Sequence, residues 1–276
     1  MPKPAYHIHC RDTIEALEDL SGSGFAADLV ISSPPYNIGK AYEARAPLAV
    51  YMDWQAEVVQ LLSRTIRPGG NLVWQVGNYV DRGEVLPLDY LFIPVMQEAG
   101  FKLRNRFMWH FGHGLHAKHR FSGRHETVLW FSHGDGYFHD PRFILPAGQE
   151  PPADADISPV VRQAMETGIW DIPNVKHNHP EKLDHPCQFT VAIAERAVLG
   201  LSRPGDLVLD PFCGVASAGV AALAHGRFFT GIERHPDYCV AAESRLDATL
   251  EGSAKWRPHD LEVARPRVAV DGGPGF

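Results

Sequence analysis

Two short segments of the chain combine side chains that could do chemistry. The first, Ser33-Pro34-Pro35-Tyr36, follows an apolar run at residues 27–32, and its two prolines cannot donate to a β-ladder. The Pro34 carbonyl and the Ser33 hydroxyl are two acceptors, which is what an exocyclic amine with two N–H groups needs. The Tyr36 ring is a flat surface on which a nucleobase can stack, a contact worth about 1–3 kcal/mol. We therefore predict a pocket for an amine-bearing base, with a plain surface turn as the alternative.

The second segment, residues 210–217, reads Asp-Pro-Phe-Cys-Gly-Val-Ala-Ser and joins an apolar run to the start of a helix. A helix start presents free backbone N–H groups and the positive end of the helix dipole, which suit an anionic group. Glu233 follows about twenty residues later, where an acidic side chain can accept both hydroxyls of a ribose. A Gly-x-Gly-x-x-Gly motif is absent, and Asp210 would repel a pyrophosphate. The segment predicts a ligand with a ribose, an adenine and an amino-acid carboxylate; the alternative is an ordinary turn of an α/β protein.

Short apolar runs alternate with longer helical patterns along the chain, which is typical of an α/β fold with a mostly parallel sheet. The expected strands are residues 27–32, 71–76, 101–111, 125–132, 207–210 and 227–232. The expected helices follow an N-cap at Asp53, cover residues 87–99 and 215–224, begin near Phe189 and start again at Pro236. Ligands of such sheets collect beyond the carboxyl ends of the strands, so both chemical segments should face one crevice.

A crevice shared by an amine and an adenosine-type ligand resembles the S-adenosylmethionine-dependent DNA amino-methyltransferases. Ser33-Pro-Pro-Tyr36 matches their catalytic motif, and Asp210-Pro-Phe-x-Gly214 matches their cofactor loop. His185-Pro-Cys-Gln188 is similar to the start of their cofactor-binding helix. The catalytic motif comes before the cofactor motif, as in the circularly permuted beta group of this family. Ala216 stands where the family usually has a third glycine, so we expect the methionine end of the cofactor to be held slightly differently.

The resemblance implies a Rossmann-like methyltransferase fold with helices on both faces of a seven-stranded, mostly parallel sheet that has one antiparallel strand. It covers most of residues 6–40, 53–131 and 185–247. It divides the chain into a catalytic half (1–131), a target-recognition insertion (132–184), a cofactor-binding half (185–251) and a flexible tail (252–276). The insertion coincides with a proline-rich stretch in which the alternation of strands and helices is interrupted.

The resemblance also implies roles for individual residues. The catalytic residues are Ser33, Pro34, Pro35 and Tyr36. The residues that bind S-adenosylmethionine are Asp12, His185, Asp210, Phe212, Cys213, Gly214, Ala216, Ser217 and Glu233. The resemblance places Asn37 and Lys40, as DNA-binding residues, in a loop at residues 37–43 that is expected to close over the base. From the local excess of basic side chains we also expect Lys118, Arg120 and Arg124 to bind DNA. Asp12 has a second interpretation, as the N-cap of the helix that contains Ile14 and Leu17.

The implied reaction is the direct transfer of a methyl group from S-adenosylmethionine to a base amine in double-stranded DNA. The base must first be flipped out, because its amine is not accessible within the duplex. In this family a serine at the first motif position is associated with cytosine N4, and aspartate or asparagine more with adenine N6. With Ser33 in that position, we favour N4-cytosine; the alternatives are N6-adenine and a catalytically inactive DNA-binding protein. The resemblance leaves open a cognate restriction endonuclease as a partner and a homodimer as the assembly.

Composition limits the other classes of protein. The chain has 276 residues, of which 45% are hydrophobic and 21% charged, as in ordinary globular proteins. Apolar runs stay well below the roughly 18 residues of a membrane span, and the first residues lack the apolar core of a secretion signal, so we expect a cytoplasmic location. The net charge is −7, but basic side chains and histidines are concentrated between Lys102 and Glu126, which predicts a basic stripe for DNA.

Two further patterns point to other chemistry. Pro186-Cys187-Gln188-Phe189 resembles the nucleophile motif of the cytosine C5 methyltransferases, but their Glu-Asn-Val motif is absent and the cofactor loop follows the cysteine. Histidines occur at every third position from His110 to His119, a spacing that fits neither a strand face nor a helix face repeatedly. We therefore expect a base amine rather than a ring carbon as the methyl acceptor, and no metal site.

Overall fold

The computed structural model describes residues 3–40, 43–112, 119–121, 123–140, 142–143, 157–176 and 178–260. Its core is an eight-stranded sheet with the strand order β1-β10-β9-β2-β3-β7-β6-β8. These strands are β1 (Tyr6–Cys10), β2 (Ala27–Ser32), β3 (Ile66–Val76), β6 (Phe101–His110), β7 (His125–His133), β8 (Ile169–Asp171), β9 (Leu207–Asp210) and β10 (Phe228–Glu233). β7 is antiparallel to both of its neighbours, and every other neighbouring pair is parallel, which confirms the predicted single antiparallel strand.

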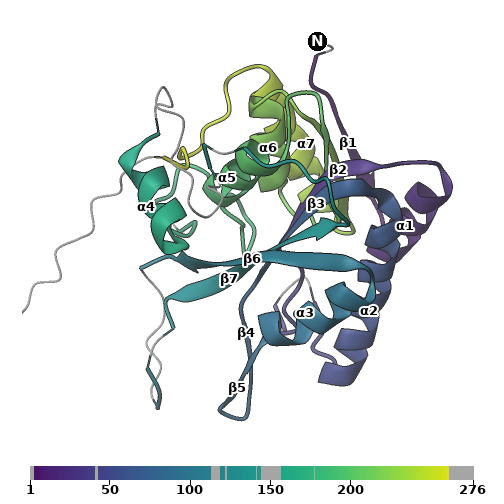
Figure 1. Ribbon diagram of the computed structural model, residues 1–276, viewed down its shortest axis with the longest axis vertical. Helices are drawn as coiled ribbons and strands as arrows, with labels where there is room; N and C mark the ends of the chain where they lie inside the picture. Colours follow the sequence, from purple (N-terminus) through teal and green to yellow (C-terminus); the bar gives the residue numbers. More distant parts are fainter. Residues whose placement is uncertain are drawn as a thin grey trace, which may run out of the picture.

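Helices cover both faces of this sheet (Figure 1). One layer consists of α1 (Thr13–Gly22), α2 (Leu48–Thr65) and α3 (Leu88–Glu98), and the other of α5 (Val191–Leu201), α6 (Ser217–Ala224) and α7 (Pro236–Leu250). The buried hydrophobic residues accordingly form two clusters, one under each layer. Strands covered on both faces need apolar side chains at nearly every position, which is why β2 and β9 could be found as continuous apolar runs.

The order of the strands places the two chemical segments side by side. β2 pairs in parallel with β9, with Leu29 opposite Val208 and Val30 opposite Leu209. Both strands therefore end at the same edge of the sheet. Ser33 leaves the end of β2, and the segment that begins at Asp210 leaves the end of β9, so the fold brings together two parts of the chain that are far apart in sequence.

The structure corrects several boundaries predicted from the sequence. α2 begins at Leu48, after Pro47, so Asp53 lies inside the helix and is not its N-cap. The sheet has eight strands in the described part of the chain rather than seven, because the proline-rich stretch adds β8 beside β6 and buries Trp170. That stretch also contains α4 (Pro159–Thr167).

Two other features differ from the sequence predictions. A hairpin of β4 (Asn78–Asp81) and β5 (Glu84–Pro87) projects from the end of β3, where no hairpin was expected. Residues 252–260, predicted to belong to a flexible tail, pack on the body of the protein. There the His259 N–H donates to Glu195 (2.8 Å) and the Arg257 N–H donates to Glu181 (3.1 Å). The rest of the predicted tail lies outside the described residues.

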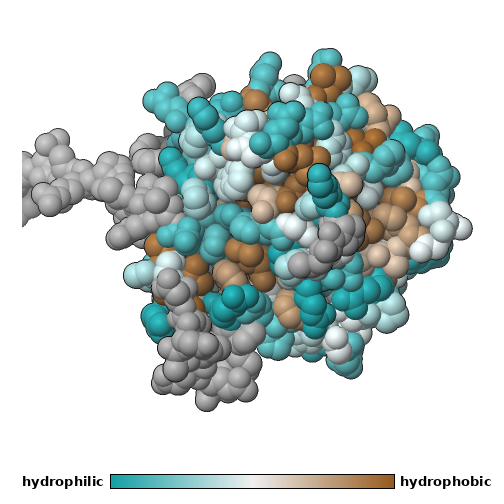
Figure 2. All heavy atoms as spheres, turned by 90° about the horizontal axis from the view of Figure 1, so that it is seen from above, coloured by the Kyte–Doolittle hydropathy of each residue, from teal (hydrophilic) through white to brown (hydrophobic). Residues whose placement is uncertain are grey.

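The surface seen from above is mostly hydrophilic, with apolar patches among the polar side chains (Figure 2). None of the described helices has both the length and the apolar character needed to cross a membrane.

Candidate active site

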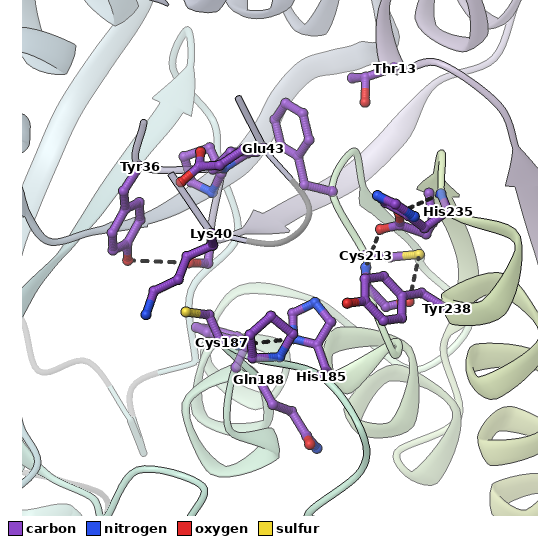
Figure 3. Close-up of a pocket in the computed structure, with 18 of the residues that line it drawn as sticks. Thr13, Tyr36, Lys40, Glu43, His185, Cys187, Gln188, Cys213, His235 and Tyr238 are labelled. Carbon is purple, nitrogen blue, oxygen red and sulfur yellow. Dashed lines mark hydrogen bonds between the residues drawn. The ribbon is translucent and has the colours of Figure 1, made fainter. Parts of the chain in front are cut away.

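One cavity of about 770 Å³ lies at the edge where β2 and β9 end. All four residues of the catalytic motif line it, and so do Asp210, Gly214 and Glu233 of the second segment. Figure 3 shows Tyr36 on one side of this pocket, His235 and Tyr238 on the opposite side, and His185 and Cys187 between them. The structure therefore brings together the two segments that the sequence predicted to share a crevice.

The wall formed by residues 210–217 contains a buried carboxyl group. Asp210 Oδ1 accepts hydrogen bonds from the Ser32 hydroxyl (2.6 Å) and from the Phe212 N–H (3.0 Å). Burial, with a smaller contribution from the neighbouring charge of Glu233, raises the pKa of Asp210 to about 7, although the two hydrogen bonds act in the opposite direction. Because its ionised form is poorly solvated, this carboxyl would be stabilised by a nearby cationic ligand.

Glu233, at the end of β10, holds the loop in place. One carboxylate oxygen accepts the Gly214 N–H (3.1 Å), and the other accepts the His235 N–H (2.8 Å). A carboxylate has about four lone-pair sites, so Glu233 can still accept hydrogen bonds from two hydroxyls of a ligand in the cavity. Gly214 has φ +50, and a Cβ atom there would lie 3.2 Å from His185 Nε2, so the loop passes close to that ring.

Ala216 does not line the cavity, and its side chain is fully buried. It has φ 57 and ψ 44, in the left-handed region that is costly for residues with a Cβ atom. This backbone conformation gives a physical reason why a glycine suits the position. A direct contact between Ala216 and the cofactor remains a prediction.

His185 lines the cavity, as predicted, but the segment 185–188 precedes α5, which begins only at Val191. Its ring packs edge-on against Tyr238, with a centroid distance of 4.6 Å. Burial, aided by the charge of Lys182, lowers the pKa of His185 to about 4. The ring is therefore neutral at physiological pH and offers one donor and one acceptor. Cys187 lines the same part of the cavity.

Asp12 has the position that its N-cap interpretation requires, and its contact with a cofactor remains a prediction. It is the N-cap of α1, where its side chain accepts the Ile14 N–H (2.8 Å), and it also lines the cavity. The next residue, Thr13, donates from its hydroxyl to the Pro211 carbonyl (3.0 Å), which ties α1 to the loop after β9. The remaining predicted cofactor residues that line the cavity are Phe212, Cys213 and Ser217.

The catalytic motif forms the other wall. The Ser33 and Tyr36 hydroxyls are 3.2 Å apart, and the Tyr51 hydroxyl donates to the Pro35 carbonyl (2.7 Å), which anchors the motif to α2. Burial of the Tyr36 hydroxyl raises its pKa well above the usual value, so this group stays protonated. All four residues of the motif line the cavity, and the roles of the Ser33 oxygen, the Pro34 carbonyl and the Tyr36 ring toward a base remain predictions.

The loop after the motif is held by its own side chains. Asn37, with φ 60, pairs its amide with the backbone of Ala46 at 2.7 and 2.8 Å. The Glu43 carboxylate accepts the N–H groups of Asn37 (2.9 Å) and Ile38 (2.8 Å). Asn37 is buried and closes the loop, whereas Lys40 is exposed and lines the cavity. DNA contacts of both residues remain predictions.

The sequence analysis missed the polar residues that complete this wall. Glu126 at the start of β7, Gln75 near the end of β3 and Asn174 after β8 all line the cavity. Their contributions depend on pairings between distant segments, such as that of Trp109 with Glu126 across β6 and β7. The one local signal is that Gln75 and Glu126 each lie near an end of a predicted strand, whereas Asn174 has no such signal.

The predicted basic stripe is only partly present. Lys102 and Arg104 both bind the Asp135 carboxylate, at 2.7 and 2.8 Å, and Arg106 binds Asp89. Their charges are therefore largely compensated within the protein. Of the other residues expected at the DNA, Arg120 is exposed and Arg124 is half-buried, and neither lines the cavity, whereas Lys118 lies outside the described residues.

Comparison with known proteins gives a consistent result. A family model described as DNA methylase matches residues 27–244. Type II methyltransferase M.BglII from Bacillus subtilis is 38% identical over 84% of the chain and 66% of its own length. M.ScaI from Streptomyces caespitosus, also a type II methyltransferase, is 31% identical over 90% of the chain and 85% of its own length. The DNA adenine methyltransferase YhdJ of Escherichia coli is 28% identical, over 83% and 79%.

Solved structures share the fold. TTHA0409 from Thermus thermophilus, crystallised with S-adenosyl-L-methionine, is 27% identical with a TM-score of 0.64, covering 90% of this chain and 96% of its own. The cytosine-N4-specific PvuII DNA methyltransferase has a TM-score of 0.69 at 22% identity, covering 91% and 95%. The second likeness supports the Rossmann-like architecture alone.

Proposed function

Because the chain belongs to the N6/N4 family of DNA methylases, we propose that it transfers a methyl group from S-adenosylmethionine to the N4 amine of a cytosine flipped out of double-stranded DNA. The observation that carries this proposal is the single cavity lined by both Ser33-Pro-Pro-Tyr36 and the loop after β9. An amine acceptor pair and an adenosine-type site in one cavity are what a direct methyl transfer between two bound molecules requires.

The described residues fit the cofactor. Glu233 can accept the two ribose hydroxyls while it keeps its bonds to Gly214 and His235. The neutral His185 can donate to a carboxylate, and the buried Asp210 favours a cation nearby. When bound, S-adenosylmethionine supplies the methyl group, which it carries on a positively charged sulfur. The crystal complex of the related TTHA0409 with this molecule supports the assignment.

On the other wall, Ser33 and the Pro34 carbonyl accept the two N–H groups of the base amine and hold its nitrogen toward the cofactor. The Tyr36 ring stacks on the extruded base, at about 1–3 kcal/mol. The chain needs no nucleophile of its own for this transfer, so its contribution is positioning and electrostatics.

The insertion 132–184 is our candidate for target recognition. In its described part, Asn174 and Val175 reach the cavity, and Asn174 Oδ1 is buried with no hydrogen-bond partner among the described residues. A buried acceptor without a partner costs about 1–3 kcal/mol, and a donor on the extruded base would remove this cost. Lys40, Arg120 and Arg124 would provide phosphate contacts, and a restriction endonuclease is a natural partner for a type II enzyme.

Ser33 favours cytosine N4, because a serine at this position of the motif is associated with that amine. N6-adenine is the alternative, and the 28% identity to a DNA adenine methyltransferase favours it. Both amines lie next to a ring nitrogen, so the same acceptor pair could hold either of them.

Mass spectrometry of nucleosides distinguishes the two amines. The protein is expressed in a bacterial strain without DNA methyltransferases, and its genomic DNA is digested to nucleosides. We expect N4-methylcytosine, and none in a strain that expresses the Ser33→Ala, Tyr36→Ala double variant. N6-methyladenine instead would overturn the N4 assignment in favour of the alternative, and the absence of both would contradict the proposed function.

A further inference from the structure

Among the described residues, Glu126 is the one acidic residue hydrogen-bonded to the catalytic motif, and the reaction outlined above gives it no role. Its side chain lies at the start of β7 and lines the cavity. One carboxylate oxygen, Oε2, accepts hydrogen bonds from the Tyr36 hydroxyl (3.2 Å) and from the Gln75 side-chain amide. Burial raises the pKa of this carboxyl, and both hydrogen bonds oppose that effect.

The packing around Gly77 shows how closely these groups are fitted. Val76 pairs with Thr127 across β3 and β7, so the end of β3 lies beside Glu126. A Cβ atom on Gly77 would lie 2.9 Å from the Tyr36 ring and 3.2 Å from the Glu126 carboxylate. The ring and the carboxylate are therefore both packed against bare backbone, and neither can move toward β3.

The partners of the Tyr36 hydroxyl determine which way its proton points. This hydroxyl has one proton, and two of its neighbours, Glu126 Oε2 (3.2 Å) and the Gln75 carbonyl (3.4 Å), are acceptors. Tyr36 can therefore donate toward them, and the closer of the two is the carboxylate, which is also the stronger acceptor. Its own lone pairs are then left for the third neighbour, the Ser33 hydroxyl at 3.2 Å.

The direction of this hydrogen-bond chain extends to the reacting group. If Tyr36 donates to Glu126, Ser33 donates to Tyr36, and the Ser33 oxygen keeps its lone pairs for the base amine. With the opposite direction, the Ser33 proton would point into the cavity, where it would oppose the N–H groups of the amine. We propose that Glu126 is a positioning residue that sets this direction, so that Ser33 acts as an acceptor toward the base. The inference rests on the proposed function but holds for a cytosine or an adenine amine.

Three variants separate this role from a merely structural one. Glu126→Gln keeps an oxygen at the same place, so we expect methylation within about threefold of wild type. Glu126→Leu removes the acceptor, and Tyr36→Phe removes the hydroxyl but keeps the ring. We expect each of these two to lower kcat about tenfold or more, with little change in KM for DNA, since one hydrogen bond to the reacting amine is lost. Asp89→Asn is the control. Asp89 is a buried carboxylate on α3 that lies outside the cavity and accepts a hydrogen bond from Thr127, the neighbour of Glu126 on β7.

The double variant gives the sharpest test. Because Glu126 acts through the Tyr36 hydroxyl, Tyr36→Phe, Glu126→Leu should be no slower than Tyr36→Phe alone. The proposal would be overturned if the fall in kcat of the double variant were the product of the falls in the two single variants. A Glu126→Leu protein with wild-type kcat would overturn it as well.

A second readout does not depend on methylation. In protein labelled with ¹³C at the tyrosine Cζ, the Tyr36 signal, identified by its loss in Tyr36→Phe, should move in Glu126→Leu and stay in place in Glu126→Gln. If the wild-type protein methylates no DNA, the proposed function fails, while this signal still tests the hydrogen bond from Tyr36 to Glu126. A Tyr36 signal that does not move in Glu126→Leu would contradict the hydrogen bond from Tyr36 to Glu126.

Discussion

On the cofactor side of the cavity, the polar groups are tied to backbone: Glu233 binds two N–H groups and Asp210 binds the Phe212 N–H and a neighbouring hydroxyl. On the base side, the loop after the catalytic motif is held by Asn37 and by the Glu43 carboxylate. The first wall lies at the ends of β9 and β10, whereas the loop that follows the catalytic motif is closed by two of its own side chains.

This difference suggests that the two walls have separate functions. A small cofactor of constant shape is served best by a preformed site, because little ordering is needed when it binds. An extruded nucleotide enters together with a long polyanion, and a loop held by few bonds can open to admit it. We expect substitutions on the cofactor side to change binding of S-adenosylmethionine, and those on the base side to change the reaction with DNA.

The largest effect is expected for the buried carboxyl of the cofactor side. Its folded pKa of about 7 lies above the unfolded value near 4, so the folded state holds its proton more tightly, and this group makes the protein less stable as the pH rises from about 4 to 7. Asp210→Asn can keep both hydrogen bonds, since they meet at one oxygen. In urea unfolding, the free energy of unfolding of the variant should rise relative to that of wild type by up to about 4 kcal/mol between pH 4 and pH 8. A constant difference over this range would contradict the account.

A somewhat smaller effect is expected for the ribose acceptor. Glu233→Ala should weaken S-adenosylmethionine binding about 100-fold, because two charge-assisted hydrogen bonds are lost and two backbone N–H groups lose their partner. Isothermal titration calorimetry measures the change. Glu243→Ala, at an exposed position on α7, is the matched control and should bind as wild type does. If the Glu233 variant and the control bound S-adenosylmethionine with equal affinity, the assignment of Glu233 to the cofactor site would be wrong.

Tyr36→Ala should show the reverse pattern. Relative to Tyr36→Phe, which already lacks the hydroxyl, the loss of a stacking surface worth about 1–3 kcal/mol lowers kcat/KM for DNA roughly another 5- to 150-fold, while cofactor affinity stays within about twofold. Steady-state methylation and calorimetry on the same preparation check both parts. An equal loss of cofactor affinity would show that the two walls are not independent.

The smallest effect is expected in the loop itself. Glu43→Gln loses a charge-assisted acceptor for two N–H groups, so the loop should open more easily at a cost in overall stability below about 1 kcal/mol. Limited proteolysis should cut the variant faster between residues 37 and 46, while its thermal midpoint falls by no more than about 3 °C. Wild-type cleavage rates would indicate that the loop is held by other contacts.

The sequence was most informative where local pattern and tertiary structure agree. β2 and β9 are apolar because both faces of each are covered, and the motifs at their ends could be placed from that alone. The start of α2 was misplaced because Asp53 looks like a cap, whereas the chain enters the helix earlier, through Pro47. Glu126 could not be found because its position beside the catalytic motif depends on the pairing of β7 with β3, about fifty residues away in sequence.

The central claim is that one cavity holds the methyl donor and the extruded base side by side. A crystal structure with S-adenosylhomocysteine and a duplex that contains the methylated sequence, found by sequencing modified DNA, tests it most directly. We predict the ribose at Glu233, the target base stacked on Tyr36, and its amine at Ser33, about 3–4 Å from the place of the transferred methyl group. A base bound away from Tyr36, or a cofactor away from Glu233, would contradict the account.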